Sequence, residues 1–205
     1  MSFLNSMIRR LLVVLLFVSF SFGVFAQNAD INILRTINHD RPVGLDPFFR
    51  TITNSTYPIS VAIPAAMVGA GFLQKDSTLK NHGFQVIAAL GLAAVVTEGL
   101  KVIVQRSRPF TSYPSIQKAG EGDGSSFPSG HVSIAFTTAT SLSLLNHRWY
   151  VVVPSFAWAS TIAYARMDLG VHYPSDVLAG AIIGSTSAFV TYKANKWLHK
   201  RRSYR

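Results

Sequence analysis

The sequence predicts an all-α protein, an integral membrane bundle of about five transmembrane helices that follows an N-terminal signal peptide or signal anchor. Only 14% of the residues are charged, whereas 49% are hydrophobic, and the mean hydropathy is +0.29. The apolar residues gather in long runs that contain glycine and other small residues, as is typical of membrane helices. A length of 205 residues suits one domain with a sizeable core.

Residues 1–26 have the pattern of a signal sequence. Arg9 and Arg10 precede an apolar run from Leu11 to Phe25, and Ala26 ends a Val-Phe-Ala stretch that suits cleavage. An uncleaved signal anchor is the alternative, because the run approaches the lower length limit for spanning a bilayer. Both alternatives place residue 27 outside the cytoplasm.

Residues 27–56 are expected to form a periplasmic or interfacial amphipathic segment. Ile31, Leu34 and Ile37 recur at helical spacing among charged residues, which favours a helix lying at the membrane surface. Two dipeptides further on are typical of turns, namely Arg41-Pro42 and Asp46-Pro47.

Residues 57–192 are expected to form the membrane domain. Its five apolar segments run over about residues 57–73, 83–104, 131–145, 149–165 and 176–192. Several barely reach the roughly 20 residues that a membrane helix needs, but tilting and flanking aromatic or basic residues can compensate. A soluble helical bundle with an apolar core is the alternative.

Basic residues predict the orientation in the membrane. With residue 27 outside, five crossings leave residues 74–82, 146–148 and the basic tail 193–205 in the cytoplasm. These segments hold most of the basic residues that flank the crossings, which agrees with the positive-inside rule. We therefore expect a multi-pass protein of a bacterial inner (plasma) membrane, with residues 105–130 and 166–175 facing the periplasm or exterior.

Three short polar patterns lie at the predicted outer ends of the apolar segments. The first is Lys101 followed after six residues by Arg108-Pro109. The second is the run from Pro128 through Ser129 and Gly130 to His131. The third is Arg166, then His172 after five residues, then Asp176 four positions later.

These residue types can hold a phosphate. Lys101, Arg108 and Arg166 supply three cations for a dianion, and arginine adds a bidentate fork that matches phosphate oxygens. Gly130 lets the backbone approach closely, and amides at the start of the helix after Pro128 point at an anion. Such a cradle requires no metal.

The two histidines can add chemistry to this cradle. Asp176 can fix the tautomer of His172 and leave its other ring nitrogen free to attack phosphorus. His131 can then protonate the leaving alkoxide and afterwards activate water. Taken singly, Ser129 and Asp176 also suit helix capping. The prediction therefore depends on the conjunction of all three patterns on one face of the membrane.

This conjunction resembles the type 2 phosphatidic acid phosphatase family. The resemblance spans residues 101–176 and implies the fold of the family's integral-membrane branch. It implies His172 as nucleophile, His131 as general acid and Asp176 as the residue that orients the nucleophile. It also implies a phosphate-binding set without a metal or other cofactor: Lys101, Arg108, Ser129, Gly130 and Arg166. The chain departs from the pattern at Ala165, where the family usually has serine, and a lost hydrogen bond to phosphate with slower turnover is expected.

The sequence therefore predicts a hydrolase, a metal-independent lipid phosphate or lipid diphosphate phosphohydrolase that acts through a phosphohistidine at the outer face of the membrane. A non-specific acid phosphatase or a vanadium-dependent haloperoxidase on the same fold is one alternative, and a non-catalytic phosphate-lipid binding protein is another. The expected partners are a phosphorylated membrane lipid and the bilayer, with no obligatory protein partner. Nucleic acid is not expected despite the net charge of +10, because no soluble module interleaves basic and aromatic residues. The absence of cysteine excludes disulfides and thiolate nucleophiles.

Overall fold

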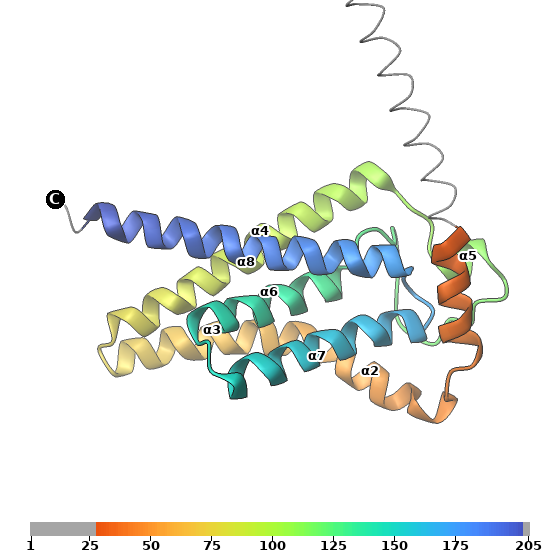
Figure 1. The fold of residues 1–205 in the computed structure, drawn as a ribbon, viewed down its shortest axis with the longest axis horizontal. Coiled ribbons are helices and arrows are strands. Elements are labelled where there is room, and N and C mark those ends of the chain that lie inside the picture. Colours follow the sequence, from red (N-terminus) through yellow and green to blue (C-terminus); the bar gives the residue numbers. More distant parts are fainter. Residues whose placement is uncertain (1–27, 203–205) are drawn as a thin grey trace, which may run out of the picture.

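The structure is a computed structural model, and it describes residues 28–202 (Figure 1). The signal peptide or signal anchor expected at residues 1–26 lies outside the described residues. Within residues 28–202 every regular element is a helix, so the all-α prediction is confirmed.

Five long helices form the bundle, and they match the five predicted apolar segments (Figure 1). They are α3 (Thr56–Leu73), α4 (Ser77–Val104), α6 (Gly130–Leu145), α7 (Trp149–Asp168) and α8 (Pro174–Arg202). α4 begins before its apolar segment does, because the Asp76 carboxylate caps it by accepting hydrogen bonds from the amides of Thr78 and Leu79 at 2.8 and 3.1 Å. α8 continues into the predicted basic tail.

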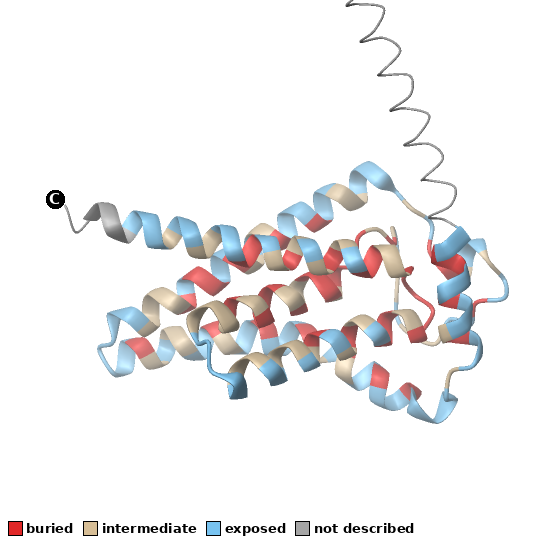
Figure 2. Cartoon of the chain, in the orientation of Figure 1, coloured by how far each residue is buried: buried red, intermediate tan, exposed pale blue. Residues whose placement is uncertain are grey.

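α6 lies at the centre and packs against α3, α4, α7 and α8. Its buried residues form a stripe through the middle of the bundle (Figure 2). Buried hydroxyls join it to its neighbours: Thr97 donates to Ser133 at 3.0 Å, and Thr138 donates to Ser60 at 2.8 Å. Such interhelical hydrogen bonds help to hold membrane helices together.

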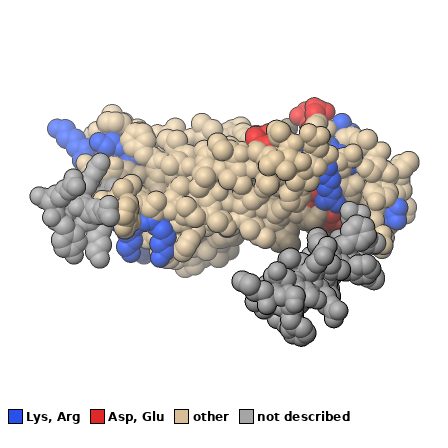
Figure 3. All heavy atoms as spheres, turned by 90° about the horizontal axis from the view of Figure 1, so that it is seen from above, with Lys and Arg blue, Asp and Glu red and all other residues tan. Residues whose placement is uncertain are grey.

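The chain is a membrane protein. Among the residues that the structure describes, three helical stretches are long and apolar enough to cross a bilayer: Val43–Leu73, Ser77–Ser112 and Pro174–Leu198. α6 has only 16 residues, or about 24 Å of helix, but its neighbours surround it on several sides. Charged side chains gather toward the two ends of the molecule, and most of the surface between them is uncharged in Figure 3.

The N-terminal described segment folds back onto the end of the bundle. Residues 28–39 are helical, and Ile31 and Leu34 are buried in a cluster with Ile116 and Tyr173. A short 3-10 helix, η1 (Val43–Leu45), and α2 (Asp46–Asn54) follow. The turn predicted at Asp46-Pro47 is wrong, because these residues open α2, where a proline in the first turn costs no hydrogen bond.

Candidate active site

The three polar patterns meet at one end of the bundle. α4 and α7 run toward this end, and α6 and α8 start from it, so residues 105–129 and 169–173 lie there together with the helix 28–39 (Figure 1). A short helix, α5 (Pro109–Ser112), lies in the first of these loops. The predicted threading therefore brings all the predicted site residues to the same end.

His172 lies in the turn between α7 and α8 and is 2% exposed. Its Nδ1 donates a hydrogen bond to the Ser126 carbonyl oxygen at 2.8 Å, which assigns the proton to Nδ1 and the lone pair to Nε2. Burial lowers the pKa of His172 well below 6.5, and the charges of Arg166 and Arg108 lower it further. The ring is therefore neutral at neutral pH, as a nucleophile must be.

The Asp176 carboxylate lies close to this ring without a direct hydrogen bond. Its Oδ2 is 3.6 Å from His172 Nδ1 and accepts a hydrogen bond from the Tyr173 amide at 2.9 Å. The sequence predicts that Asp176 itself fixes the tautomer, whereas here the backbone carbonyl of Ser126 accepts the proton of Nδ1. Asp176 thus lies within 3.6 Å of the His172 ring while its Oδ2 also caps the start of α8.

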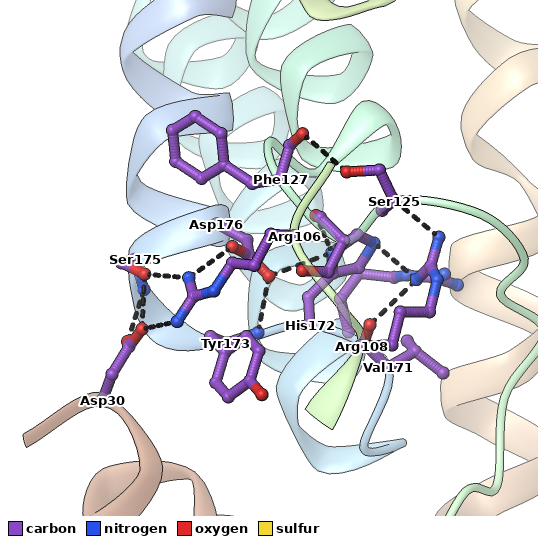
Figure 4. A network of polar contacts seen from close by, with 12 residues as sticks. Asp30, Arg106, Arg108, Ser125, Phe127, Val171, His172, Tyr173, Ser175 and Asp176 are labelled. Atoms are coloured by element: carbon purple, nitrogen blue, oxygen red, sulfur yellow. Dashed lines mark hydrogen bonds and ion pairs between the residues drawn. The ribbon is translucent and has the colours of Figure 1, made fainter. Parts of the chain in front are cut away.

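Arg108 connects the first pattern to the other two. Its guanidinium donates to the carbonyl oxygens of Val171 at 2.8 Å and Asp123 at 2.8 Å, and its Nη1 lies 3.3 Å from His172 Nε2 (Figure 4). A cation therefore lies directly beside the nitrogen that is predicted to attack phosphorus. Because its other partners are neutral carbonyls, a phosphate dianion could replace some of them with stronger hydrogen bonds.

Two buried polar atoms of the predicted site residues have no hydrogen-bond partner among the described residues. They are the Arg166 Nε and the Ser129 Oγ, on side chains that are almost fully buried. Arg166 makes a hydrogen bond through Nη2 to the Glu121 carbonyl at 2.7 Å. Buried polar groups are nearly always satisfied, so the unused donor on each side chain fits a site that receives an anionic ligand.

Lys101, Gly130 and His131 complete the cluster. Lys101 Nζ forms an ion pair of 2.8 Å with Glu98, about one helical turn earlier in α4, and a Cβ on Gly130 would lie 3.5 Å from Lys101 Nζ. His131 packs edge-on against Tyr57 with 4.9 Å between ring centroids, and it interacts electrostatically with Arg166 and His172. The structure therefore brings all eight predicted site residues together.

A cavity of about 570 Å³ opens beside this cluster. It reaches Lys101 and Arg108 and is also bounded by Glu98, Arg106 and the loop around Asp123. It does not reach His172, whose Nε2 contacts Arg108, so an entering phosphate has to displace part of the Arg108 contacts. Within residues 28–202, no group of three or more acidic or histidine side chains is placed to hold a metal ion.

Some residues near the site were missed in the sequence. Arg106 makes ion pairs to both Asp176 and Asp30, each at 2.7 Å. The position of Arg106 two residues before Arg108 could have indicated that it lies near the site. Nothing in the sequence indicates this for Asp30 or for the carbonyl of Ser126. Ala165, at the position that departs from the family pattern, is fully buried in an apolar cluster that includes Phe49.

The fold and this cluster define a membrane-embedded helical protein with a group of cations and two histidines beside a cavity at one end. Residues 82–200 match the model of the PAP2 superfamily, and the chain belongs to that superfamily, which confirms the predicted resemblance.

Three similar proteins illustrate the relationship. The chain is 31% identical over 113 residues to an undecaprenyl-diphosphatase of Sulfolobus acidocaldarius, a match covering 55% of this chain and 54% of the relative. It is 36% identical over 129 residues to a lipid A 4'-phosphatase of Bacteroides thetaiotaomicron, covering 56% and 57%. The crystal structure of Aquifex aeolicus LpxE superposes with a TM-score of 0.69 at 29% identity, covering 80% of this chain and 95% of that one. The chain spans about half the length of the curated relatives it matches.

Proposed function

We propose that the protein is a lipid phosphate or lipid diphosphate phosphohydrolase that acts through a phosphohistidine on His172 at the outer face of the membrane. One observation carries this proposal. The lone-pair nitrogen of His172, Nε2, faces the guanidinium of Arg108 in a cluster of three cations at the membrane-domain end that holds the cavity.

In the first step, His172 Nε2 attacks the phosphorus of the bound ester. The P–N bond forms as the P–O bond to the lipid breaks, and protonated His131 gives its proton to the leaving oxygen. Lys101, Arg108 and Arg166 stabilise the charge on the transferring phosphoryl oxygens. The nearby phosphate dianion itself favours the protonated form of His131.

In the second step, water hydrolyses the phosphohistidine. His131, now neutral, takes a proton from the water as its oxygen attacks phosphorus, and the P–N bond breaks to release inorganic phosphate and neutral His172. Asp176, close to the Nδ1 side of the ring, stabilises the positive charge that the ring carries while it is phosphorylated.

The position of the cavity favours a lipid substrate. Lys101 bounds it, and the next residues of α4, Val102 and Ile103, expose 71% and 78% of their surface. An apolar chain lying along this part of α4 would place its phosphate within reach of Lys101. The named activities of the similar proteins, on undecaprenyl diphosphate and lipid A, involve lipids with a phosphate group.

Purified protein in detergent tests the activity. It should release phosphate without added metal from at least one of phosphatidic acid, phosphatidylglycerophosphate, undecaprenyl diphosphate and lipid A. His172→Ala should abolish the release and keep the thermal midpoint near that of the wild type. His147→Ala, at an exposed position at the opposite end, is the matched control and should leave turnover unchanged. Turnover retained by His172→Ala would refute the nucleophile assignment.

The covalent intermediate can be trapped. His131→Asn lacks both the acid of the first step and the base of the second, so it should take up labelled phosphate from the substrate slowly and then hold it. The label should be stable to alkali and labile to acid. The double variant with His172→Asn should take up none. Label that survives in the double variant would place the phosphoryl group on another residue.

The orientation can be tested because the chain has no cysteine. Ser115→Cys lies in the exposed loop at the active-site end, and Asn146→Cys lies in the exposed loop at the other end. A membrane-impermeant maleimide applied to intact cells should label the first variant and spare the second. The reverse pattern would place the site in the cytoplasm.

A further inference from the structure

A second charged network lies beside His172, on the side away from Arg108 (Figure 4). Arg106 stands at its centre, between the carboxylates of Asp30 and Asp176, with an ion pair of 2.7 Å to each. Its guanidinium lies over the Tyr173 ring at 3.8 Å from the centroid. The network thus joins the helix 28–39, the end of α4 and the start of α8.

Arg106 differs from Arg108 in what it contacts. Nη1 of Arg106 donates to Asp176 Oδ1 and to Ser175 Oγ, both at 2.7 Å, and Nη2 donates to Asp30 Oδ2. Both terminal nitrogens are therefore engaged by carboxylates, which a phosphate cannot displace as easily as the neutral carbonyls around Arg108. Arg106 borders the cavity, but none of the three residues that accept its hydrogen bonds lines it.

Asp30 also contributes to this network, although it belongs to none of the three polar sequence patterns. Its Oδ1 accepts a hydrogen bond from the Ser175 amide at 2.8 Å, in the first turn of α8. Asp30 is 6% exposed, and Asp176 is fully buried. Buried ion pairs are costly to break one partner at a time, so loss of Arg106 leaves the Asp30 and Asp176 carboxylates without their shared cation, and loss of Asp30 removes one of the two carboxylates that hold Arg106 in place.

The orientation of the Asp176 carboxylate depends on Arg106. With Oδ1 held by Arg106, Oδ2 stays turned toward the Tyr173 amide at 2.9 Å and toward His172 Nδ1 at 3.6 Å. A carboxylate freed from Arg106 can rotate away from the ring. The ring then loses the negative charge that balances it when Nε2 is phosphorylated.

We infer that Asp30 and Arg106 are positioning residues, which hold Asp176 against His172 and so make the helix 28–39 a working part of the active site. This helix precedes the matched region 82–200. The inference rests on the proposed role of His172 as the nucleophile. It predicts that Asp30 and Arg106 affect the rate of phosphoryl transfer. Substrate affinity should depend instead on the three cations Lys101, Arg108 and Arg166.

Four variants of the full-length protein test this inference: Asp30→Asn, Arg106→Gln, their double variant, and Arg106→Lys. Each is assayed on whichever of the four lipids above the wild type hydrolyses fastest. We expect kcat to fall about 10-fold for Asp30→Asn and about 100-fold for Arg106→Gln, with KM within about twofold, because misplacement of catalytic groups lowers rate more than binding. The double variant should be no slower than Arg106→Gln, since Asp30 acts through Arg106. Arg106→Lys keeps one cation and should recover part of the loss, and it serves as a second test if Arg106→Gln fails to fold.

A matched control lies on the same helix. Asn38 is fully buried and exchanges hydrogen bonds with the backbone of Gln117, at 3.0 and 2.8 Å, and with the carbonyl of Asp168 at 2.8 Å. Asn38→Ala should lower the thermal midpoint at least as much as Asp30→Asn does, but kcat should stay within about threefold of wild type.

Three results would overturn the inference: equal losses of kcat in Asn38→Ala and Asp30→Asn, losses that multiply in the double variant, or a rise in KM at constant kcat. The first would make the helix 28–39 a purely structural support, and the last would make Arg106 a substrate ligand. The proposed function fails separately, if His172→Ala retains turnover or no lipid is hydrolysed.

Discussion

Gly180→Ala should displace the second sequence pattern and slow turnover. α8 packs on α6 through Gly180 and Gly184, and a Cβ on Gly180 would lie 2.7 Å from the Ser129 carbonyl oxygen and 3.2 Å from the Ser133 amide nitrogen. An ordinary carbon–oxygen contact needs about 3.3 Å or more, so α6 and α8 must separate by about 0.6 Å at this point. Ser129 carries an unpartnered hydroxyl at the proposed phosphate site, and its displacement would move part of that site.

The expected magnitude follows from this displacement. A shift of 1 Å in a catalytic group costs up to about 100-fold in rate, so about 0.6 Å should lower kcat roughly 10-fold, or about 1.4 kcal/mol of transition-state stabilisation. Overpacking should also lower the free energy of unfolding by about 1–3 kcal/mol. Phosphate release and the thermal midpoint in detergent measure the two effects.

The other glycines give the controls for this prediction. A Cβ on Gly184 would overlap the Ser133 carbonyl oxygen, one turn farther from the site than Ser129. Compared with Gly180→Ala, Gly184→Ala should therefore lower the free energy of unfolding more in proportion to the loss of kcat. Gly91 has open space around its Cβ position, and Gly91→Ala should leave both quantities unchanged. Wild-type kcat and midpoint in Gly180→Ala, or equal damage from Gly91→Ala, would refute the reasoning.

Three further outcomes are expected. Burial lowers the pKa of His172, the proposed nucleophile, well below 6.5, so kcat/KM should stay on its plateau as pH falls through 6.5, and an acid limb of the rate at or above 6.5 would contradict the assignment. The unfolded ring binds a proton near pH 6.5 and the folded ring does not, so the free energy of unfolding should fall below that pH. Glu98→Gln removes the carboxylate that competes with phosphate for Lys101. An exposed ion pair of this kind is worth about 0.2–1 kcal/mol, so KM for an anionic lipid should fall up to about fivefold. A raised KM would show that Glu98 assists binding. Asp76→Ala should cost about 1 kcal/mol of stability without changing kcat, because this cap lies at the end opposite the site, and Asp76→Asn should retain most of the stability.

The helices and the site residues could be predicted because each depends on a local pattern. Apolar runs of sufficient length predict the five long helices. The candidate site residues are identified by fixed spacings, such as those from Lys101 to Arg108 and from Arg166 to His172. The orientation of helices, alternately toward and away from one end, then brings the patterns together. No long-range contact has to be known for this step.

The supporting contacts could not be predicted, because they join residues that are distant in sequence or use the backbone. Asp30 and Arg106 are 76 positions apart, and Asp30 gives no sign in the sequence of being anything but a surface charge. The acceptor for His172 Nδ1 is the Ser126 carbonyl, a group that every residue possesses. Such contacts follow only from the packing of loop 105–129 against the turn after α7.

Ala165 shows how the structure changes a prediction made from the family pattern. A serine is usual at this position, and the sequence predicts that its absence costs a hydrogen bond to phosphate. In the structure Ala165 is fully buried in a cluster with Phe49, Leu169 and Val171, and it does not border the cavity. A hydroxyl placed here faces apolar side chains rather than the cations.

Ala165→Ser should therefore leave kcat within about twofold of wild type. The new hydroxyl can donate to the carbonyl oxygen four residues earlier in α7, which keeps the stability cost to about 1 kcal/mol. The experiment compares kcat, KM and the thermal midpoint of the variant and the wild type on the same lipid. A clear rise in kcat would restore the family-based expectation, because only a hydrogen bond to the transferring phosphoryl group could supply it, and it would mean that α7 rotates when substrate binds.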